Sequence, residues 1–175
     1  MKNVKLFFIS MMLIFASATL YSCAPSKEEV VKQSIENLFY DIAHQKIDHF
    51  HIMTKAKVES WGLKESDLGG EGSFLYMAFK EEKVWLELWT NEVLVALHEA
   101  GADKGLNWNS YKVTAVESTI EDYDEDAKKM KNGKTGYVAQ GTATIESNGK
   151  QYKFEFKDLA ITDGEAFLVL PQSFE

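Results

Sequence analysis

The sequence contains no arginine, so all 19 of its basic residues are lysines. Only arginine offers a planar fork that binds carboxylates and phosphates through two parallel hydrogen bonds, so its absence disfavours a phosphate- or nucleotide-handling site. Acidic residues number 27, and the chain carries a formal net charge of −8. This balance disfavours nucleic-acid binding and electrostatic docking on anionic lipid headgroups, both of which depend on clustered positive charge. We therefore expect no nucleic-acid partner.

Cysteine occurs only once, at Cys23, which excludes an intramolecular disulfide. A short basic start and an apolar run at 6–20 precede it, in the layout of a secretory signal peptide. The run is too short for a comfortable transmembrane helix, which needs about 20 apolar residues. The tetrapeptide at 20–23, Leu-Tyr-Ser-Cys, resembles a bacterial lipobox, the signal for cleavage and lipidation of lipoproteins.

The lipobox resemblance implies that residues 1–22 are removed as a signal peptide and that Cys23 carries diacylglycerol and a further acyl chain such as palmitate. Several acyl chains on one residue anchor a protein stably. Cleavage removes two lysines and no acid, which changes the net charge from −8 to −10, so the lipid must do the anchoring. We expect residues 23–26 to be a tether at the bacterial cell envelope, most simply at the outer membrane. Residues 27–29 fit either the acidic tag of some surface-exposed lipoproteins or the acidic first turn of a helix.

Residues 27–44 are expected to form the first helix. Ser26 can cap its start, and Glu28 and Glu29 fall in the first turn, where acidic residues favour the positive end of the helix dipole. At 100° per residue the apolar side chains share one stripe, and His44 lies on the opposite, exposed side. The stripe comprises Val31, Ile35, Leu38, Phe39 and Ile42.

The next part of the chain is less regular. A turn and a second short helix reaching about Val58 are expected, followed by a glycine-rich break. The apolar residues of segment 74–100 lie nearly all round a helical wheel. The segment is therefore either one central helix covered on several sides or two separate segments. Gly101 is the expected C-terminal cap.

From Tyr111 onward the hydrophobic period changes to two, which predicts strands. Asn148-Gly149 is the strongest short hairpin signal, and a two-residue turn sets the register. The alternation slips near Lys157 and Asp158, which predicts a bulge that bends the sheet. Three cross-strand pairs are expected on the core side: Ile145 with Tyr152, Ala143 with Phe154, and Gly141 with Phe156.

Helices followed by an antiparallel meander of about four strands predict a single α+β domain over residues 27–175, with the helices packed on one face of a bent sheet. This order, the opening amphipathic helix and the meander ending near "FLVLP" resemble the cystatin-like, nuclear-transport-factor-like superfamily. The resemblance implies either a bacterial envelope lipoprotein of unassigned function or an isomerase or dehydratase with a conical pocket between helices and sheet.

Motifs for phosphate, calcium or metal chemistry fail at required positions. Gly133-Lys134-Thr135 lacks the first glycine of a phosphate-binding loop, because Lys128 stands in its place. The acidic stretch 122–126 lacks the glycine and the final glutamate of a calcium-binding loop. His49 and His51 could share a metal only if that stretch were extended. We therefore expect no metal site and no cofactor.

An enzyme of this fold needs an acid or base that points inward. On the sheet only Tyr152 could titrate, and Asp158 supplies a nearby acid at the expected bulge. The helices add four further pocket candidates, although aromatic residues at these spacings are more often plain core: Tyr40, Asp41, Trp85 and Trp89.

Two functions follow from these candidates. The first is a lipid-anchored, non-catalytic envelope protein that binds a protein partner or a small apolar ligand. The alternative is a small pocket enzyme of isomerase or dehydratase type. A filled interior would favour the binding protein, whereas a buried, hydrogen-bonded acid or histidine in a cavity would favour the enzyme. We expect the binding protein.

Overall fold

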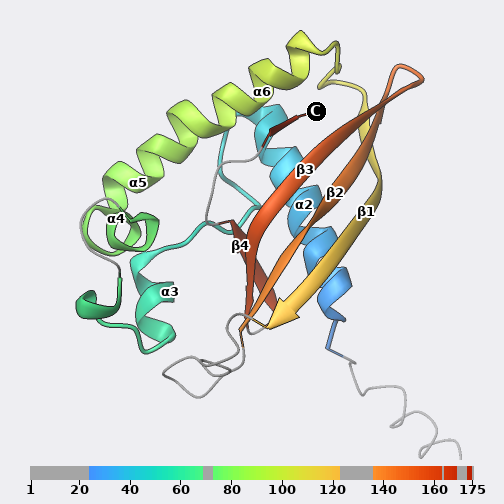
Figure 1. Cartoon of the computed structure of the whole chain (residues 1–175). Helices are drawn as coiled ribbons and strands as arrows, with labels where there is room; N and C mark the ends of the chain where they lie inside the picture. The colour runs from blue at the N-terminus through green and yellow to red at the C-terminus, as the bar shows by residue number, and fades with distance from the viewer. Residues whose placement is uncertain (1–23, 69–72, 123–135, 163, 169–172, 175) are drawn as a thin grey trace, which may run out of the picture.

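The structure confirms the predicted α+β class. Helices precede a four-stranded antiparallel meander, to which a short fifth strand is added (Figure 1). Cys23 and residues 1–22, the predicted signal peptide, lie outside the described residues. The computed structural model describes residues 24–68, 73–122, 136–162, 164–168 and 173–174.

Helix α2 (Lys27–His44) has the bounds that the sequence predicts. The Ser26 hydroxyl accepts a hydrogen bond from the Glu29 backbone N–H, and the Glu29 carboxylate accepts one from the Ser26 backbone N–H at 2.8 Å. This reciprocal pair is a capping box, which satisfies two donors that the helix start leaves unpaired. The predicted apolar stripe is buried and His44 is exposed.

Residues 45–54 contain no helix, so the second helix begins later than expected. Helix α3 (Lys55–Ser60) starts at Thr54, whose hydroxyl accepts a hydrogen bond from the Lys57 backbone N–H. One turn of 3₁₀ helix, η1 (Glu65–Asp67), follows. The irregular segment before α3 lets the chain fold back across the end of α2.

Segment 74–100 forms two separate parts. Helix α4 (Phe74–Lys80) stands alone. The second part is continuous and consists of α5 (Glu82–Leu88), one wider π-type turn η2 (Trp89–Val93) and α6 (Leu94–Asp103). Of the two alternatives left open by the helical wheel, the structure therefore shows two segments.

Gly101 does not cap α6, because the helix continues two residues beyond it. The glycine that ends the helix is Gly105, directly after the cap residue Lys104, and it takes the left-handed φ of +93°. Its N–H donates to the Ala102 carbonyl at 2.8 Å and the Leu106 N–H donates to the Gly101 carbonyl at 3.0 Å, the two bonds of a Schellman ending. Gly101 is needed for packing instead, since an added Cβ would lie 2.5 Å from the Trp108 ring.

The sheet has the order β1-β2-β3-β4, and every neighbouring pair is antiparallel. The fifth strand pairs with β3 on the same side as β4 but further toward the start of β3. The strands are β1 (Tyr111–Asp122), β2 (Tyr137–Ser147), β3 (Lys150–Thr162), β4 (Glu165–Leu168) and β5 (Ser173–Phe174).

The β2–β3 hairpin has the predicted register. Asn148 and Gly149 have φ values of +53° and +73°, as a type I′ turn requires. The predicted bulge is also present, because Lys157 and Asp158 together oppose Gln140, with Asp158 at φ +54°. All three predicted pairs are observed: Ile145 with Tyr152, Ala143 with Phe154, and Gly141 with Phe156.

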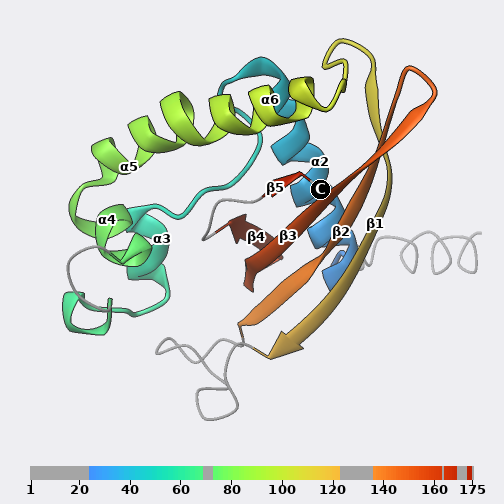
Figure 2. The same cartoon turned by 45° about the horizontal axis from the view of Figure 1, so that its top comes forward.

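Helix α2 lies against one face of the curved sheet and contacts β1, β3, β4 and α6 (Figures 1 and 2). The rod formed by α5, η2 and α6 crosses the C-terminal end of α2, and α3 and α4 lie side by side away from β1 (Figures 1 and 2). The space between α2 and the sheet is filled by fully buried side chains: Ile35, Leu38, Phe39, Ile42, Ile145, Phe154 and Phe156.

Candidate functional site

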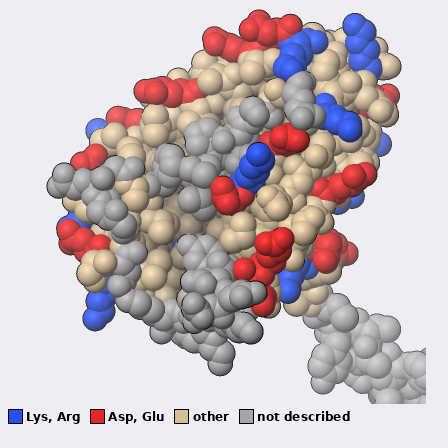
Figure 3. Space-filling model, in the orientation of Figure 1, with Lys and Arg blue, Asp and Glu red and all other residues tan. Residues whose placement is uncertain are grey.

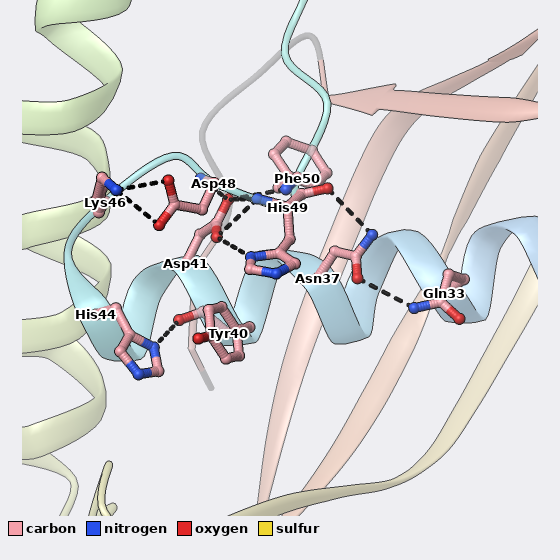
Figure 4. A network of polar contacts seen from close by, with 9 residues as sticks. All are labelled: Gln33, Asn37, Tyr40, Asp41, His44, Lys46, Asp48, His49 and Phe50. Carbon is pink, nitrogen blue, oxygen red and sulfur yellow. Dashed lines mark hydrogen bonds and ion pairs between the residues drawn. The ribbon is translucent and has the colours of Figure 1, made fainter.

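Asp41 is the only charged side chain that is buried in the described part of the chain, with an exposed fraction of 0%. Its carboxylate accepts backbone hydrogen bonds from Asp48 and His49 at 3.1 Å and from Phe50 at 2.8 Å (Figure 4). A buried carboxylate is tolerated only when its oxygens are hydrogen-bonded. Asp41 therefore holds the segment after α2 against the last turns of that helix.

Two histidines flank the Tyr40 ring, next to Asp41 in the sequence. The His44 ring stacks on Tyr40 with centroids 4.1 Å apart, and the half-exposed His49 ring meets it edge-on at 4.3 Å (Figure 4). His44 Nδ1 lies 2.8 Å from the Tyr40 carbonyl oxygen and must donate, because a carbonyl only accepts. The Nε2 atom of His44 is left for another partner.

His49 Nδ1 lies 3.5 Å from the Asp41 carboxylate. An acid that orients a histidine is one half of the arrangement found in catalytic triads. Here the carboxylate already receives three backbone N–H groups, and neither residue lines either of the two pockets described below. The geometry therefore favours a structural role for this pair.

An open pocket of about 580 Å³ lies between α2 and the start of β1, and we call it the α2–β1 pocket. One ridge of α2, with residues four apart on the same helix face, forms one wall. The chain leading into β1 and the first residues of β1 form the other. The pocket is lined by Glu36, Tyr40, His44, Trp108, Asn109, Tyr111, Lys112 and Val113.

The aromatic rings of the α2–β1 pocket are held by core contacts. Trp108 is 8% exposed, its Nε1–H donates to the His98 carbonyl at 2.8 Å, and its ring stacks on the His98 ring. Tyr111 meets Trp108 at 5.7 Å with the ring planes 70° apart. Tyr40, by contrast, is 41% exposed. The pocket thus has a rigid aromatic base and one solvent-facing ring.

Burial raises the pKa of Tyr111 above its ordinary value of 10.0, and negative charge on Tyr40 and Asp41 raises it further. Because burial favours the neutral form of Tyr111, the contribution of this residue to folding stability is complete below pH 10.0. The contribution is lost as the pH rises through the higher pKa of the folded state.

We expect Tyr111→Phe to remove the part of the tyrosine ionisation curve at the highest pH in an ultraviolet titration. The variant should also lose less stability than the unaltered protein at high pH. Tyr76→Phe in α4 is the matched control, and identical curves for both variants would contradict the prediction.

A second open pocket of about 510 Å³ lies between the first half of α2 and β4. Its polar side chains are largely paired with one another or with backbone groups. Gln33 donates to Asn37 at 3.0 Å, Asn37 donates to the His49 carbonyl at 3.1 Å, and Glu165 forms an ion pair with Lys57. Because these hydrogen bonds and this ion pair occupy polar groups that a ligand would need, the α2–β1 pocket is the better candidate for a binding site.

The six pocket candidates from the sequence lie in different places. Tyr40 lines the α2–β1 pocket, and Asp41 is buried behind it. Asp158 is exposed at the bulge of β3. The Tyr152 hydroxyl donates to the Gly105 carbonyl at 2.9 Å, which ties the sheet to the end of α6.

Trp85 and Trp89, the remaining two candidates, are core residues in α5 and η2. Their rings pack edge to face with centroids 5.8 Å apart, and the Trp85 Nε1–H donates to the Met53 carbonyl at 2.8 Å. Of the six candidates, only Tyr40 lines either pocket.

The other residues of the α2–β1 pocket were not among the sequence candidates. Glu36 and His44 lie four residues on either side of Tyr40, and this spacing could have pointed to one shared helix face. The polar stretch 107–112, with its tryptophan and tyrosine, carried no comparable signal, because its position beside α2 depends on the whole fold.

The chain matches no protein family model, no curated protein and no solved structure. Among the described residues, no group of three or more histidine, cysteine, aspartate or glutamate side chains is placed to hold a metal ion. The described helices also include none with the length and apolar character needed to cross a bilayer.

Proposed function

We propose that the protein is a lipid-anchored, non-catalytic binding protein of the bacterial cell envelope, and that its partner or ligand binds at an open surface site. The filled interior between α2 and the sheet carries this proposal. An isomerase or dehydratase of the proposed fold family would need an inward acid or base beside a cavity. Instead, the buried Asp41 carboxylate holds three backbone N–H groups.

The anchor is proposed at Cys23, on the strength of the lipobox-like tetrapeptide after a basic and apolar leader. The described fold begins shortly afterwards, at the capping box of α2, so the tether is short. Acidic and basic side chains are interspersed over the face shown in Figure 3. A lipid is therefore a better membrane anchor for this protein than electrostatic attraction.

The relation to the cystatin-like, nuclear-transport-factor-like superfamily is also proposed. An opening helix packed against a bent antiparallel meander supports it. The bulge at Asp158 supplies a bend in β3. If the protein is a member, it keeps the architecture of the superfamily, and apolar side chains fill the space between helix and sheet where some other members have a pocket.

The alternative, a small pocket enzyme, is favoured by one observation, the Asp41–His49 pair at 3.5 Å. The pair would have to act at the surface, where His49 is half exposed. Because charged groups at a wet surface interact weakly with a substrate, the binding protein is the better conclusion.

We expect Cys23→Ser to abolish metabolic labelling with a fatty acid and to release the protein from the membrane fraction, because the thiol that accepts the lipid is gone. Ser26→Ala, which changes the helix cap and keeps Cys23, should label and fractionate like the unaltered protein. A Cys23→Ser variant that still labels and still sediments with membranes would refute lipid anchoring.

A further inference from the structure

We propose that the α2–β1 pocket binds the ring of a neutral sugar. The inference rests on the proposed non-catalytic binding function and assigns the ligand class of that site. It is carried by two features of the pocket, which are an aromatic surface and a surrounding set of donors and acceptors without partners in the described structure.

The aromatic surface suits the apolar face of a sugar ring. Tyr40 is 41% exposed, and His44 stacks on it at 4.1 Å. Tyr111 and Trp108 stand nearly perpendicular at the base, with centroids 5.7 Å apart. Sugar rings expose C–H groups on their flat faces, and these groups pack on aromatic rings without any need for charge. The core contacts of Trp108 hold the base in place before a ligand arrives, which limits the ordering cost of binding.

The polar groups of the pocket are available to bind hydroxyl groups. Within the described residues, no hydrogen bond or ion pair involves the hydroxyls of Tyr40 and Tyr111, the side-chain amide of Asn109 or the Lys112 ammonium. Together they offer donors and acceptors, as a sugar hydroxyl, which both donates and accepts, requires. The corresponding groups of the pocket near β4 are largely paired.

The charges of the pocket favour a neutral ligand. Glu36 and Lys112 line it together and have opposite signs. The Glu36 carboxylate also lies 3.9 Å from the Lys32 ammonium, so its charge is partly balanced. An anion would meet Glu36, and a cation would meet Lys112. The volume of about 580 Å³ lies within the range of about 300–1,000 Å³ that is usual for small-ligand sites.

Binding can be measured with the full chain, purified in a polyoxyethylene detergent that contains no sugar. The probes are glucose, galactose and N-acetylglucosamine with their linear di- and trisaccharides, detected by saturation-transfer-difference NMR. Tetramethylammonium serves as the charged probe for an aromatic cage. We expect at least one neutral sugar to bind and tetramethylammonium not to compete with it.

The variants test the two features separately. Tyr40→Ala should weaken sugar binding at least tenfold, and Tyr40→Phe, which keeps the ring, should weaken it less. Asn109→Ala should weaken binding several-fold, through lost hydrogen bonds alone. Lys112→Ala should also weaken it, whereas Lys153→Ala, which removes an exposed lysine from β3, should leave it unchanged. Circular dichroism of each variant checks that it is folded.

The proposal is overturned if no neutral sugar binds, if the Tyr40→Ala and Asn109→Ala variants bind the sugar as tightly as the unaltered protein, or if tetramethylammonium displaces the sugar. Failure of the proposed function would look different. A sugar that binds in the pocket but is chemically converted, as NMR of the mixture would reveal, supports the site and refutes the non-catalytic function. If no sugar binds but Cys23 is lipidated normally, the proposed ligand class is refuted and the proposed lipid anchoring is not.

Discussion

Gly141→Ala should lower the free energy of unfolding by about 3 kcal/mol or more, the upper end of the range for an overpacked interior. A Cβ at Gly141 would lie 2.9 Å from the Cα of Ser118 and closer still to the Glu117 carbonyl oxygen, both in the backbone of β1. Real Cβ atoms essentially never approach other atoms this closely. A backbone neighbour cannot rotate away as a side chain can, so the two strands would have to separate.

The structure gives a different physical reason for this loss of stability from the one that the sequence suggests. The register predicts that a side chain at Gly141 would crowd Phe156, its partner in β3. In the structure the nearest obstacles lie on the other side, in β1. Gly141→Val should therefore be at least as harmful as Gly141→Ala.

Thr142→Val is the matched control for this position, because Thr142 is the next residue of β2 and faces away from the core. We expect it to change stability by no more than about 0.5 kcal/mol. Urea denaturation followed by circular dichroism measures all three variants. Equal midpoints for Gly141→Ala and Thr142→Val would show that β1 does not approach Gly141 as described.

Asp41→Ala should lower the free energy of unfolding by about 3 kcal/mol, because it leaves three backbone N–H groups without their acceptor, at a cost of about 1–3 kcal/mol for each buried donor. Two of these groups are only partly buried, so the lower part of that range applies to them. Asp41→Asn keeps one acceptor oxygen and should cost less than the alanine variant. Urea midpoints measure both changes.

Asp48→Ala provides the control, since Asp48 is an exposed carboxylate in the same segment and pairs with Lys46 at 2.8 Å. Exposed ion pairs contribute about 0–1 kcal/mol, so this variant should remain close to the unaltered protein. If Asp41→Ala were as stable as Asp48→Ala, the carboxylate would not be holding the segment after α2. A role for Asp41 in chemistry would then regain support.

Local patterns were sufficient for several elements of this protein. Ser26 and Glu29 form a capping box within one helical turn, and the apolar stripe of α2 repeats every three to four residues. Asn148-Gly149 sets the hairpin register through the positive φ values of two adjacent residues. These features could be predicted because the interacting residues are close along the chain.

Other elements were predicted only in part. The segment at 74–100 has apolar residues on all sides, and neither alternative could be chosen until the positions of α2 and α3 were known. Gly101 looked like the glycine that ends the helix, but Gly105 serves that purpose. Glycine is needed at position 101 because the Trp108 ring lies where a side chain would be. Contacts with α2 and β5 decide the position of that ring, seven residues later in the chain.

By itself the sequence determined the helix-then-meander order, the bounds of α2, the hairpin register and the bulge at Asp158, because period, capping and turn geometry act between near neighbours. Only the tertiary structure decided that Asp41 binds backbone groups, that Gly141 lies against β1, and that Tyr40 and Tyr111 line one pocket. Each of these depends on segments brought together by folding. The distance between such segments cannot be predicted from a local residue pattern, because the packing of the whole core sets it.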